Sequence, residues 1–99
     1  MERITRGMVE RQADMLNKML GRPQTGWDTV DGKRITHAGH LFVEHNGQYG
    51  YRLVEFTDSN GNEHHPLGSA SFPARQLYDI LYAVRNALYE HWKIAERTD

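Results

Sequence analysis

The chain has 99 residues, of which 38% are hydrophobic and 25% are charged, so we expect a single domain with one modest core. Twelve basic and thirteen acidic residues leave a formal net charge of −1, which argues against a protein driven to nucleic acid by bulk charge and leaves only a local basic face open. The absence of cysteine excludes disulfides, cysteine nucleophiles and thiolate metal sites. Because the apolar fraction is low, self-association is one way to cover apolar surface that a small core leaves over.

The segment from Thr5 to Leu20 is predicted to be a helix. Its apolar residues recur at the three- and four-residue spacing of one helical face: Met8, Val9, Ala13, Leu16, Met19 and Leu20. Thr5 is a suitable N-cap, while Gly21 and Pro23 are typical of a helix end. No apolar run typical of a signal peptide precedes Thr5, and no stretch approaches the ~20 apolar residues of a membrane span. We therefore expect a cytoplasmic protein.

Residues 22–39 are rich in Gly, Pro, Asp and Thr. The dipeptide Asp31-Gly32 is a turn signal. We expect a loop or a short irregular hairpin here, built around Trp27, Val30 and Ile35.

The centre of the chain predicts an antiparallel meander. Residues 40–45 and 48–57 are expected to be strands, joined by Asn46-Gly47, the strongest short hairpin signal. A second turn at 58–61 leads to a short strand at 62–66, whose proline indicates an edge position. The meander therefore has three to four strands.

A two-residue loop at Asn46-Gly47 would fix the register of the hairpin and the side chains that share each face. One face then pairs Glu44 with Tyr49, Phe42 with Tyr51 and His40 with Leu53, and the other carries Leu41, Val43, Val54 and Phe56. Helices are expected to cover one face. The aromatic face with Phe42, Tyr49 and Tyr51 is either covered by the segment around Trp27 or offered to a partner.

The last segment predicts a long amphipathic helix that opens at Ser71, because serine is a good N-cap and Pro73 is tolerated in a first turn. Its core stripe consists of Leu77, Ile80, Leu81, Val84, Leu88 and Ala95, with Trp92 near it. Beside the stripe, Tyr78, Tyr82, Arg85 and Tyr89 form a row at three- and four-residue spacing, here called the Tyr-Arg shoulder. These tyrosines either widen the buried stripe or anchor a protein partner, since Tyr and Arg are frequent interface anchors.

These elements predict one α+β domain spanning residues 1–99. Its order is an N-terminal helix, a three- to four-stranded antiparallel meander and a long C-terminal amphipathic helix. Both helices are expected to pack on one face of the sheet, so that their apolar stripes and one sheet face form a common core.

The residues typical of catalysis are not brought together by the predicted elements. Six histidines invite a metal site, but strand alternation separates them, and no HExxH pattern completes a coordination shell. We expect no metal and no cofactor. The serines lie in polar loops without a nucleophile motif. Glu44 and Glu55 share a face in the predicted register but lie far apart, which disfavours paired acid and base catalysis. We therefore expect a protein that is not an enzyme.

Two weaker binding sites remain open. Gly68, Ser69 and Ser71, ahead of the predicted helix, could hold an anion on free backbone N–H groups, although a plain loop with an N-cap explains the same residues. Tyr49, Tyr51 and Arg52 could stack on nucleic-acid bases. The neighbouring glutamates and the lack of a basic run longer than Lys-Arg oppose that interpretation.

Several short motifs together resemble a group of small uncharacterised phage and prophage proteins. They are Ile4-Thr5, Met8-Val9-Glu10, Leu16-Asn17-Lys18, Leu20-Gly21-Arg22-Pro23, Gly50-Tyr51-Arg52-Leu53-Val54 and Gln76-Leu77-Tyr78-Asp79. The chain departs from that group in its longer helical tail from Asn86 to Thr98. The resemblance implies a phage accessory protein in a bacterial cytoplasm, a class that includes anti-CRISPR and other inhibitors of host defence. It implies no catalytic residue.

Our leading hypothesis is a non-enzymatic accessory protein that binds and blocks a host protein, with a defence component as the leading candidate. The contacts would be Tyr78, Tyr82, Arg85 and Tyr89 of the shoulder, with Tyr49, Tyr51 and Arg52 of the sheet. A second hypothesis is a small-ligand or nucleotide binder, in which the segment from Gly68 to Ser71 holds a phosphate and an aromatic ring stacks on a base. A nucleic-acid binder is the third.

Overall fold

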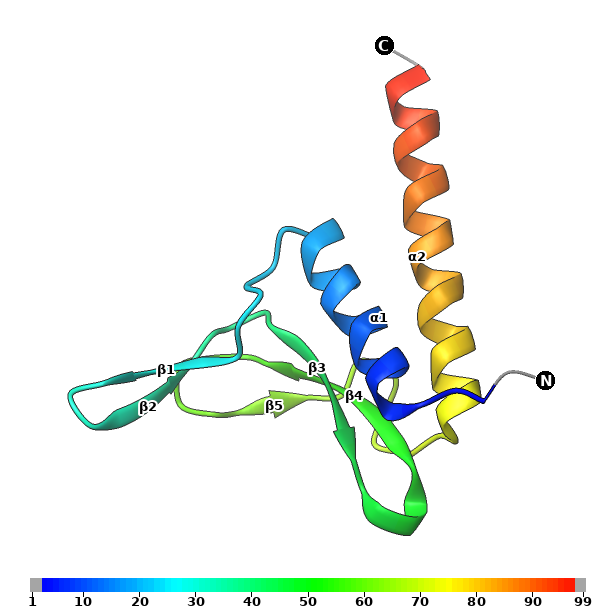
Figure 1. Cartoon of the computed structure of the whole chain (residues 1–99). Helices are drawn as coiled ribbons and strands as arrows, with labels where there is room; N and C mark the ends of the chain where they lie inside the picture. The colour runs from blue at the N-terminus through cyan, green and yellow to red at the C-terminus, as the bar shows by residue number, and fades with distance from the viewer. Residues whose placement is uncertain (1–2, 98–99) are drawn as a thin grey trace.

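A computed structural model describes the backbone of residues 3–97 and the side chains of residues 3–93. Its elements are α1 Arg6–Met19, β1 Trp27–Val30, β2 Lys33–Thr36, β3 Leu41–His45, the 3-10 turn η1 Gly47–Tyr49, β4 Tyr51–Phe56, β5 Glu63–His64 and α2 Ala74–Arg97. Strands β3, β4 and β5 form an antiparallel meander, and β1 and β2 form a separate hairpin (Figure 1). The predicted α+β fold is confirmed. Thr98, placed in the helical tail by the sequence, lies outside the described residues.

Helix α1 begins and ends where its capping residues predict. The Thr5 hydroxyl accepts a hydrogen bond from the Met8 N–H at the N-terminus. At the C-terminus Gly21 adopts a positive φ of 66°, and the N–H of Arg22 donates to the Asn17 carbonyl at 2.8 Å. This left-handed closure satisfies the last carbonyls of the helix and turns the chain toward the β1–β2 hairpin.

Both helices pack on one face of the meander, where α1 contacts β3 and α2, and α2 contacts β4. The core consists of Val9, Ala13, Leu16, Leu41, Val43, Leu53, Leu77 and Leu81. Asn17, which is fully buried, fastens α1 to the sheet. Its amide donates to the Leu41 carbonyl and accepts from the Leu41 N–H, both at 2.9 Å. A side-chain amide thus pairs with the edge of β3 as a neighbouring strand would.

The predicted hairpin register is wrong. Phe42 lies opposite Val54 instead of Tyr51, a shift of three residues (54 − 51). The connection runs through η1, and it closes with a hydrogen bond from the Asn46 N–H to the Gly50 carbonyl at 2.7 Å. A shift by an odd number moves side chains to the opposite face.

The shifted register places Leu53 with Leu41 and Val43 on the helical face, where all three are buried. Phe42 joins Val54 and Phe56 on the other face. The physical reason is burial: this pairing collects the aliphatic side chains under the helices, whereas the two-residue loop would have divided them.

Helix α2 begins at Ala74, so the predicted opening at Ser71 is wrong. Phe72 instead forms a β-bridge with Tyr51, with N–H to carbonyl distances of 2.7 and 2.8 Å. Gly50 makes this bridge possible, because a Cβ there would lie 2.4 Å from the Phe72 carbonyl oxygen and its φ is +102°. The bridge holds Pro73 at the edge of the sheet, and the helix starts from that fixed point.

Helix α2 continues well beyond the end of α1 (Figure 1). Its 24 residues span about 36 Å at 1.5 Å per residue, and the Cα radius of gyration is 15.1 Å, against about 13 Å for a compact domain of this size. Leu77 and Leu81 are buried, but Val84 is 40% exposed. The predicted core stripe is therefore wrong at Val84, since that side chain faces an open groove beside Leu16 and Leu20 at the end of α1. The side chain of Ala95 lies outside the described part.

Candidate functional site

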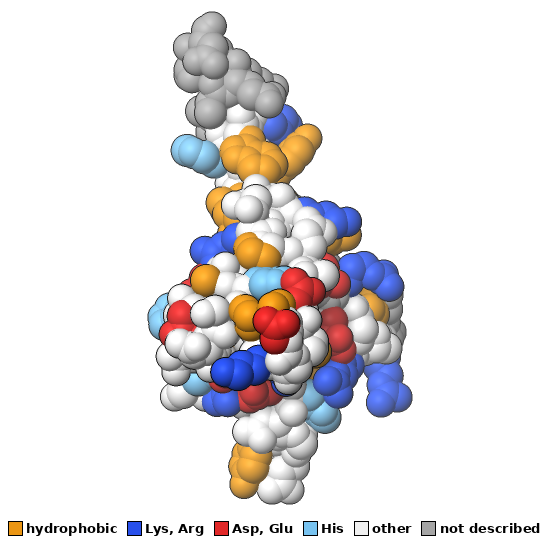
Figure 2. All heavy atoms as spheres, turned by 90° about the vertical axis from the view of Figure 1, so that its left-hand side faces the viewer, with side chains coloured by type: hydrophobic (Ala, Val, Ile, Leu, Met, Phe, Trp, Pro, Cys, Tyr) orange, Lys and Arg blue, Asp and Glu red, His pale blue; other side chains and the backbone are white. Residues whose placement is uncertain are grey.

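The projecting part of α2 carries a group of exposed apolar side chains. Tyr82, Val84, Tyr89 and Trp92, here called the distal strip, are 40 to 54% exposed. At 3.6 residues per turn they lie within one arc of about 160° on the helix. Figure 2 shows hydrophobic side chains gathered on the neck that α2 forms above the body of the protein. Four large apolar side chains exposed on one arc form an apolar patch of the kind that marks an interaction surface.

The structure divides the Tyr-Arg shoulder between core and solvent. Tyr78 is partly buried and packs against the core, with its ring stacked on Tyr82 at 6.2 Å between centroids. Arg85 donates to the Gln12 side chain of α1 at 2.6 Å, and its Nε is buried. Tyr82 and Tyr89 are exposed. Tyr78 and Arg85 therefore connect α2 to the core, while Tyr82 and Tyr89 remain accessible.

The sheet residues predicted as contacts lie on different surfaces from one another. Tyr49 is 68% exposed in η1, and this turn between β3 and β4 lies away from the projecting part of α2 (Figure 1). Tyr51 packs against the core on the helical face. Arg52 is held by Glu44 across the strands at 2.8 Å. Glu55 is on the opposite face from Glu44, so the expectation that these glutamates share a face is wrong.

Below the distal strip, an apolar groove of about 280 Å³ opens between α1, α2 and the segment after β5. We call it the leucine groove. Its apolar walls are Leu16, Leu20, Leu41, Leu53, Pro66, Leu67, Leu81 and Val84. Val84 belongs to both the leucine groove and the distal strip. The two features therefore form one continuous surface, which runs from the core edge onto the projecting helix.

One side of the leucine groove carries an ionic cluster. The Arg22 guanidinium pairs with the Glu55 carboxylate, and Arg22 also donates to the Gly39 carbonyl at 3.1 Å. His64 Nδ1 lies 3.4 Å from the other oxygen of Glu55. The charges of Arg22 and Glu55 compensate one another. These residues and His64 form the polar border of the groove.

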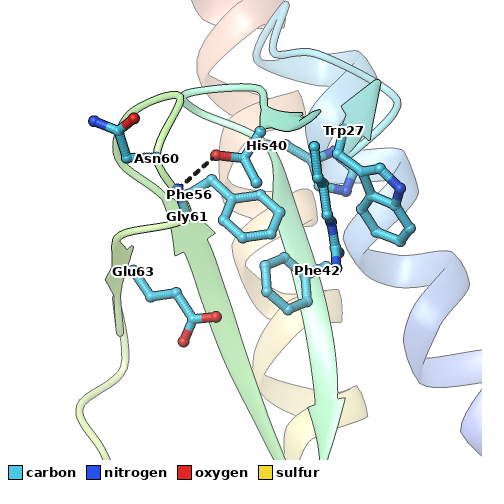
Figure 3. A pocket seen from close by; sticks show the side chains of 9 residues that line it. Trp27, His40, Phe42, Phe56, Asn60, Gly61 and Glu63 are labelled. Carbon is cyan, nitrogen blue, oxygen red and sulfur yellow. Dashed lines mark hydrogen bonds between the residues drawn. The ribbon is translucent and has the colours of Figure 1, made fainter. Parts of the chain in front are cut away.

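The structure also contains a second cavity, which the sequence did not predict. It lies on the sheet face away from the helices, has a volume of about 380 Å³ and is lined by Trp27, Arg34, Thr36, His40, Phe42, Phe56, Asn60, Gly61 and Glu63 (Figure 3). We call it the aromatic cavity. The sequence signal was alternation in the β1–β2 hairpin, where Trp27 pairs with Thr36 and Arg34 lies diagonally on the same face. Of the predicted aromatic face, only Phe42 lies here.

The anion site proposed at the start of α2 loses its basis. Gly68, Ser69 and Ser71 precede the helix by several residues, because it starts at Ala74. The N–H of Gly68 donates to the His65 carbonyl at 2.9 Å. A helix N-terminus with free N–H groups is therefore not present at Ser71.

The described residues were also compared with the requirements of a metal site and of a membrane-spanning helix. Among the side chains of residues 3–93, no three His, Asp or Glu groups gather in a way that would hold a metal ion. Within the described backbone, neither helix is both long and apolar enough to cross a membrane. Comparison of the chain with protein-family models, curated proteins and solved structures finds no match in any of the three. Function is therefore inferred from the surfaces themselves.

Proposed function

We propose that this protein acts by binding another protein through the distal strip and the leucine groove. The observation that carries the proposal is their continuity: Val84 lines the groove and begins an exposed apolar arc on a helix that projects from the body. Large aromatic groups beside an apolar pocket are typical of the centre of a protein interface. The contacts are Tyr82, Val84, Tyr89 and Trp92, of which Tyr82 and Tyr89 belong to the Tyr-Arg shoulder.

The occupant that fits this surface is an amphipathic helix of the partner. Helix α1 packs against the base of α2, where Leu77 and Leu81 are buried. The same stripe continues at Val84, which is exposed beside the end of α1, whereas Leu88 still packs against the core. A partner helix beside this part of α2 would extend the α1–α2 pair, with one apolar side chain entering the leucine groove.

The basic residues near the distal strip indicate the charge expected on the partner helix. Lys93 borders the exposed arc, with its Nζ 5.4 Å from the Tyr89 ring centroid, whereas Arg85 lies within the arc and donates to Gln12 of α1. The one acidic residue in this stretch, Glu90, lies on the back of the helix at 3.6 residues per turn. Acidic residues flanking the apolar face of the partner helix would complement this border.

The class of partner follows from the resemblance to phage and prophage proteins. It points to a host protein in a bacterial cytoplasm, with a defence component as the leading candidate. We propose that the chain, without chemistry of its own, blocks that protein by occupying its surface. The binding surface and the identity of the partner are separate proposals. Crosslinking from the distal strip tests the binding surface directly.

The test places a photo-crosslinking amino acid at position 92 and, in a parallel sample, at position 49. Tyr49 is the matched control, because it is also an exposed aromatic residue and lies in the turn between β3 and β4, away from the distal strip. Both samples are irradiated in a bacterial host lysate, and a protein that is crosslinked from position 92 but not from position 49 is purified. Its affinity is then measured by calorimetry for the wild type, the Tyr89→Ala/Trp92→Ala double variant and Tyr49→Ala. We expect the double variant to lose at least about 30-fold in affinity and Tyr49→Ala to bind normally.

Two outcomes would contradict the proposal. Equal affinities of the wild type and the double variant would show that the distal strip is not the contact. A crosslinked homodimer at position 92, dissociated by the same double substitution, would make a second copy of the chain the occupant in place of another protein. The melting temperature of the double variant is measured in parallel, because both side chains are exposed and should contribute little to stability.

A further inference from the structure

The aromatic cavity is built by segments that come together only in the fold. The β1–β2 hairpin supplies Trp27 and Arg34, the meander supplies Phe42 and Phe56, and Glu63 of β5 closes the side opposite Trp27 (Figure 3). Its volume of about 380 Å³ lies within the range of about 300–1,000 Å³ typical of small-molecule sites. The cavity lies on the face of the sheet away from the helical core, so it is separate from the leucine groove.

The floor of the cavity is aromatic. The rings of Phe42 and Phe56 are 4.7 Å apart between centroids and inclined by 35° to one another, and His40 stacks on Phe42 at 6.1 Å. Trp27, at one side, is 51% exposed. These rings provide π faces against which a planar ring can stack, the contact by which proteins hold nucleobases.

Arg34 supplies the positive charge of the cavity. Its guanidinium carbon lies 3.8 Å from the centroid of the Trp27 ring, a stacking geometry that leaves the N–H groups free at the edge of the guanidinium plane. No carboxylate among the described side chains, those of residues 3–93, forms an ion pair with Arg34. A stacked and unpaired guanidinium is suited to an anionic group, above all a phosphate.

Glu63 supplies a negative charge on the other side of the floor. The Nε2 of His65 lies 4.0 Å from the Glu63 carboxylate, beyond hydrogen-bond distance. Two carboxylate oxygens accept a pair of adjacent N–H donors. Guanine presents such a pair at N1 and N2, whereas adenine and cytosine place an acceptor beside their amino group. The carboxylate therefore favours guanine among the bases.

The walls of the cavity are fixed before any ligand arrives. The Thr36 hydroxyl donates to the Asp58 carbonyl at 2.6 Å and accepts from the Gly61 N–H at 3.0 Å, which ties the hairpin to the β4–β5 turn. His40 Nδ1 is 2.9 Å from the Pro23 carbonyl. Preformed walls lower the entropic cost of binding.

From these observations we infer that the aromatic cavity is a nucleotide site, in which a guanine base stacks on the aromatic floor, Arg34 holds the phosphate and Glu63 accepts from the base. This site is separate from the protein-binding surface on α2. Binding at one can therefore be tested without the other.

The test uses Trp27 as its own reporter. Trp92→Phe leaves Trp27 as the single tryptophan of the chain, and its fluorescence is titrated with guanosine 5′-monophosphate. Adenosine 5′-monophosphate, guanosine and ribose 5-phosphate serve as probes that lack the guanine edge, the phosphate and the base. We expect saturable quenching by guanosine 5′-monophosphate and affinities at least about tenfold weaker for each of the other three, since a hydrogen bond to a charged group contributes about 1.5–3 kcal/mol.

Variants then separate the two charges. Arg34→Gln should weaken the binding of guanosine 5′-monophosphate about tenfold and leave guanosine unchanged, while Glu63→Gln should remove the preference for guanine over adenine. Lys33→Gln is the matched control, because Lys33 lies next to Arg34 on the opposite face of the hairpin. Circular dichroism and melting curves confirm that each variant is folded.

Three results would overturn the inference. The first is the lack of saturable quenching by millimolar guanosine 5′-monophosphate. The second is equal affinity for ribose 5-phosphate, which would indicate an anion site without base stacking. The third is an equal loss of affinity for guanosine 5′-monophosphate in Arg34→Gln and Lys33→Gln. None of them bears on the partner surface of α2. Arg34→Gln should bind the protein partner with wild-type affinity.

Discussion

The base and the projecting part of α2 carry the same apolar spacing and have opposite surroundings. At the base, Leu77 and Leu81 are fully buried between α1 and the sheet. One turn later, Val84 is exposed, and Tyr89 and Trp92 follow it into solvent. The periodicity of a helix shows that it has an apolar face, but not what covers that face. Leu16 and Leu20 line the groove beside Val84 without covering it, and the projecting part of the stripe is the surface that we propose for a partner.

The first prediction concerns the anchor from which the base of α2 starts. Gly50→Ala should cost more than about 3 kcal/mol of unfolding free energy, because the new Cβ would strike the Phe72 carbonyl at a positive φ. Gly47→Ala is the control in the same turn, with a positive φ but open space around it, and should cost about 1–2 kcal/mol. Urea unfolding measures both values. Equal losses would show that the contact with Phe72 does not hold the base of α2.

The second prediction compares the two parts of the stripe directly. Leu81→Ala should destabilise the protein by about 2–5 kcal/mol, because it leaves a cavity in the core. Val84→Ala, one turn along the helix, should cost less than about 1 kcal/mol, since its side chain is already exposed. Similar losses for both would mean that the core also covers Val84.

The third prediction concerns the border between the two parts. Arg85→Ala should cost about 1–2 kcal/mol, because it removes the hydrogen bond to Gln12, whose side chain is buried. Tyr82→Ala should change stability by about 0.5 kcal/mol or less, although we expect it to weaken partner binding. Thermal unfolding separates the two. A stable Arg85→Ala variant that loses the partner would move Arg85 to the binding surface.

The smallest expected effect lies far from α2, in the hairpin beside the aromatic cavity. The pKa of His37 is raised above its ordinary value by the Thr25 carbonyl and the Asp28 carboxylate, which are 2.8 and 2.9 Å from its two ring nitrogens. Its stabilising contribution is therefore complete below about pH 6.5, and it is lost as the pH rises through the raised pKa. An NMR titration should find a lower pKa for His37 in Asp28→Asn. An unchanged pKa would leave the Thr25 carbonyl as its sole cause.

The sequence by itself determined the features that depend on local chemistry. Thr5 and Gly21 predict the two ends of α1, because capping involves residues within one turn. Asp31-Gly32 predicts the turn of the first hairpin, since both residues have a positive φ there. The apolar spacing of α2 likewise predicts a long amphipathic helix.

The tertiary structure alone decided the features that depend on distant residues. The Tyr51–Phe72 bridge fixes where α2 begins, and burial of Leu53 under the helices selects a register that the Asn46-Gly47 signal does not predict. The same is true of the two surfaces proposed for function: the leucine groove needs the end of α1 beside Val84, and the aromatic cavity needs Arg34 and Glu63 on opposite sides of one floor. The physical reason is that local signals act within a few residues, whereas burial and cavity shape depend on segments brought together by the whole fold.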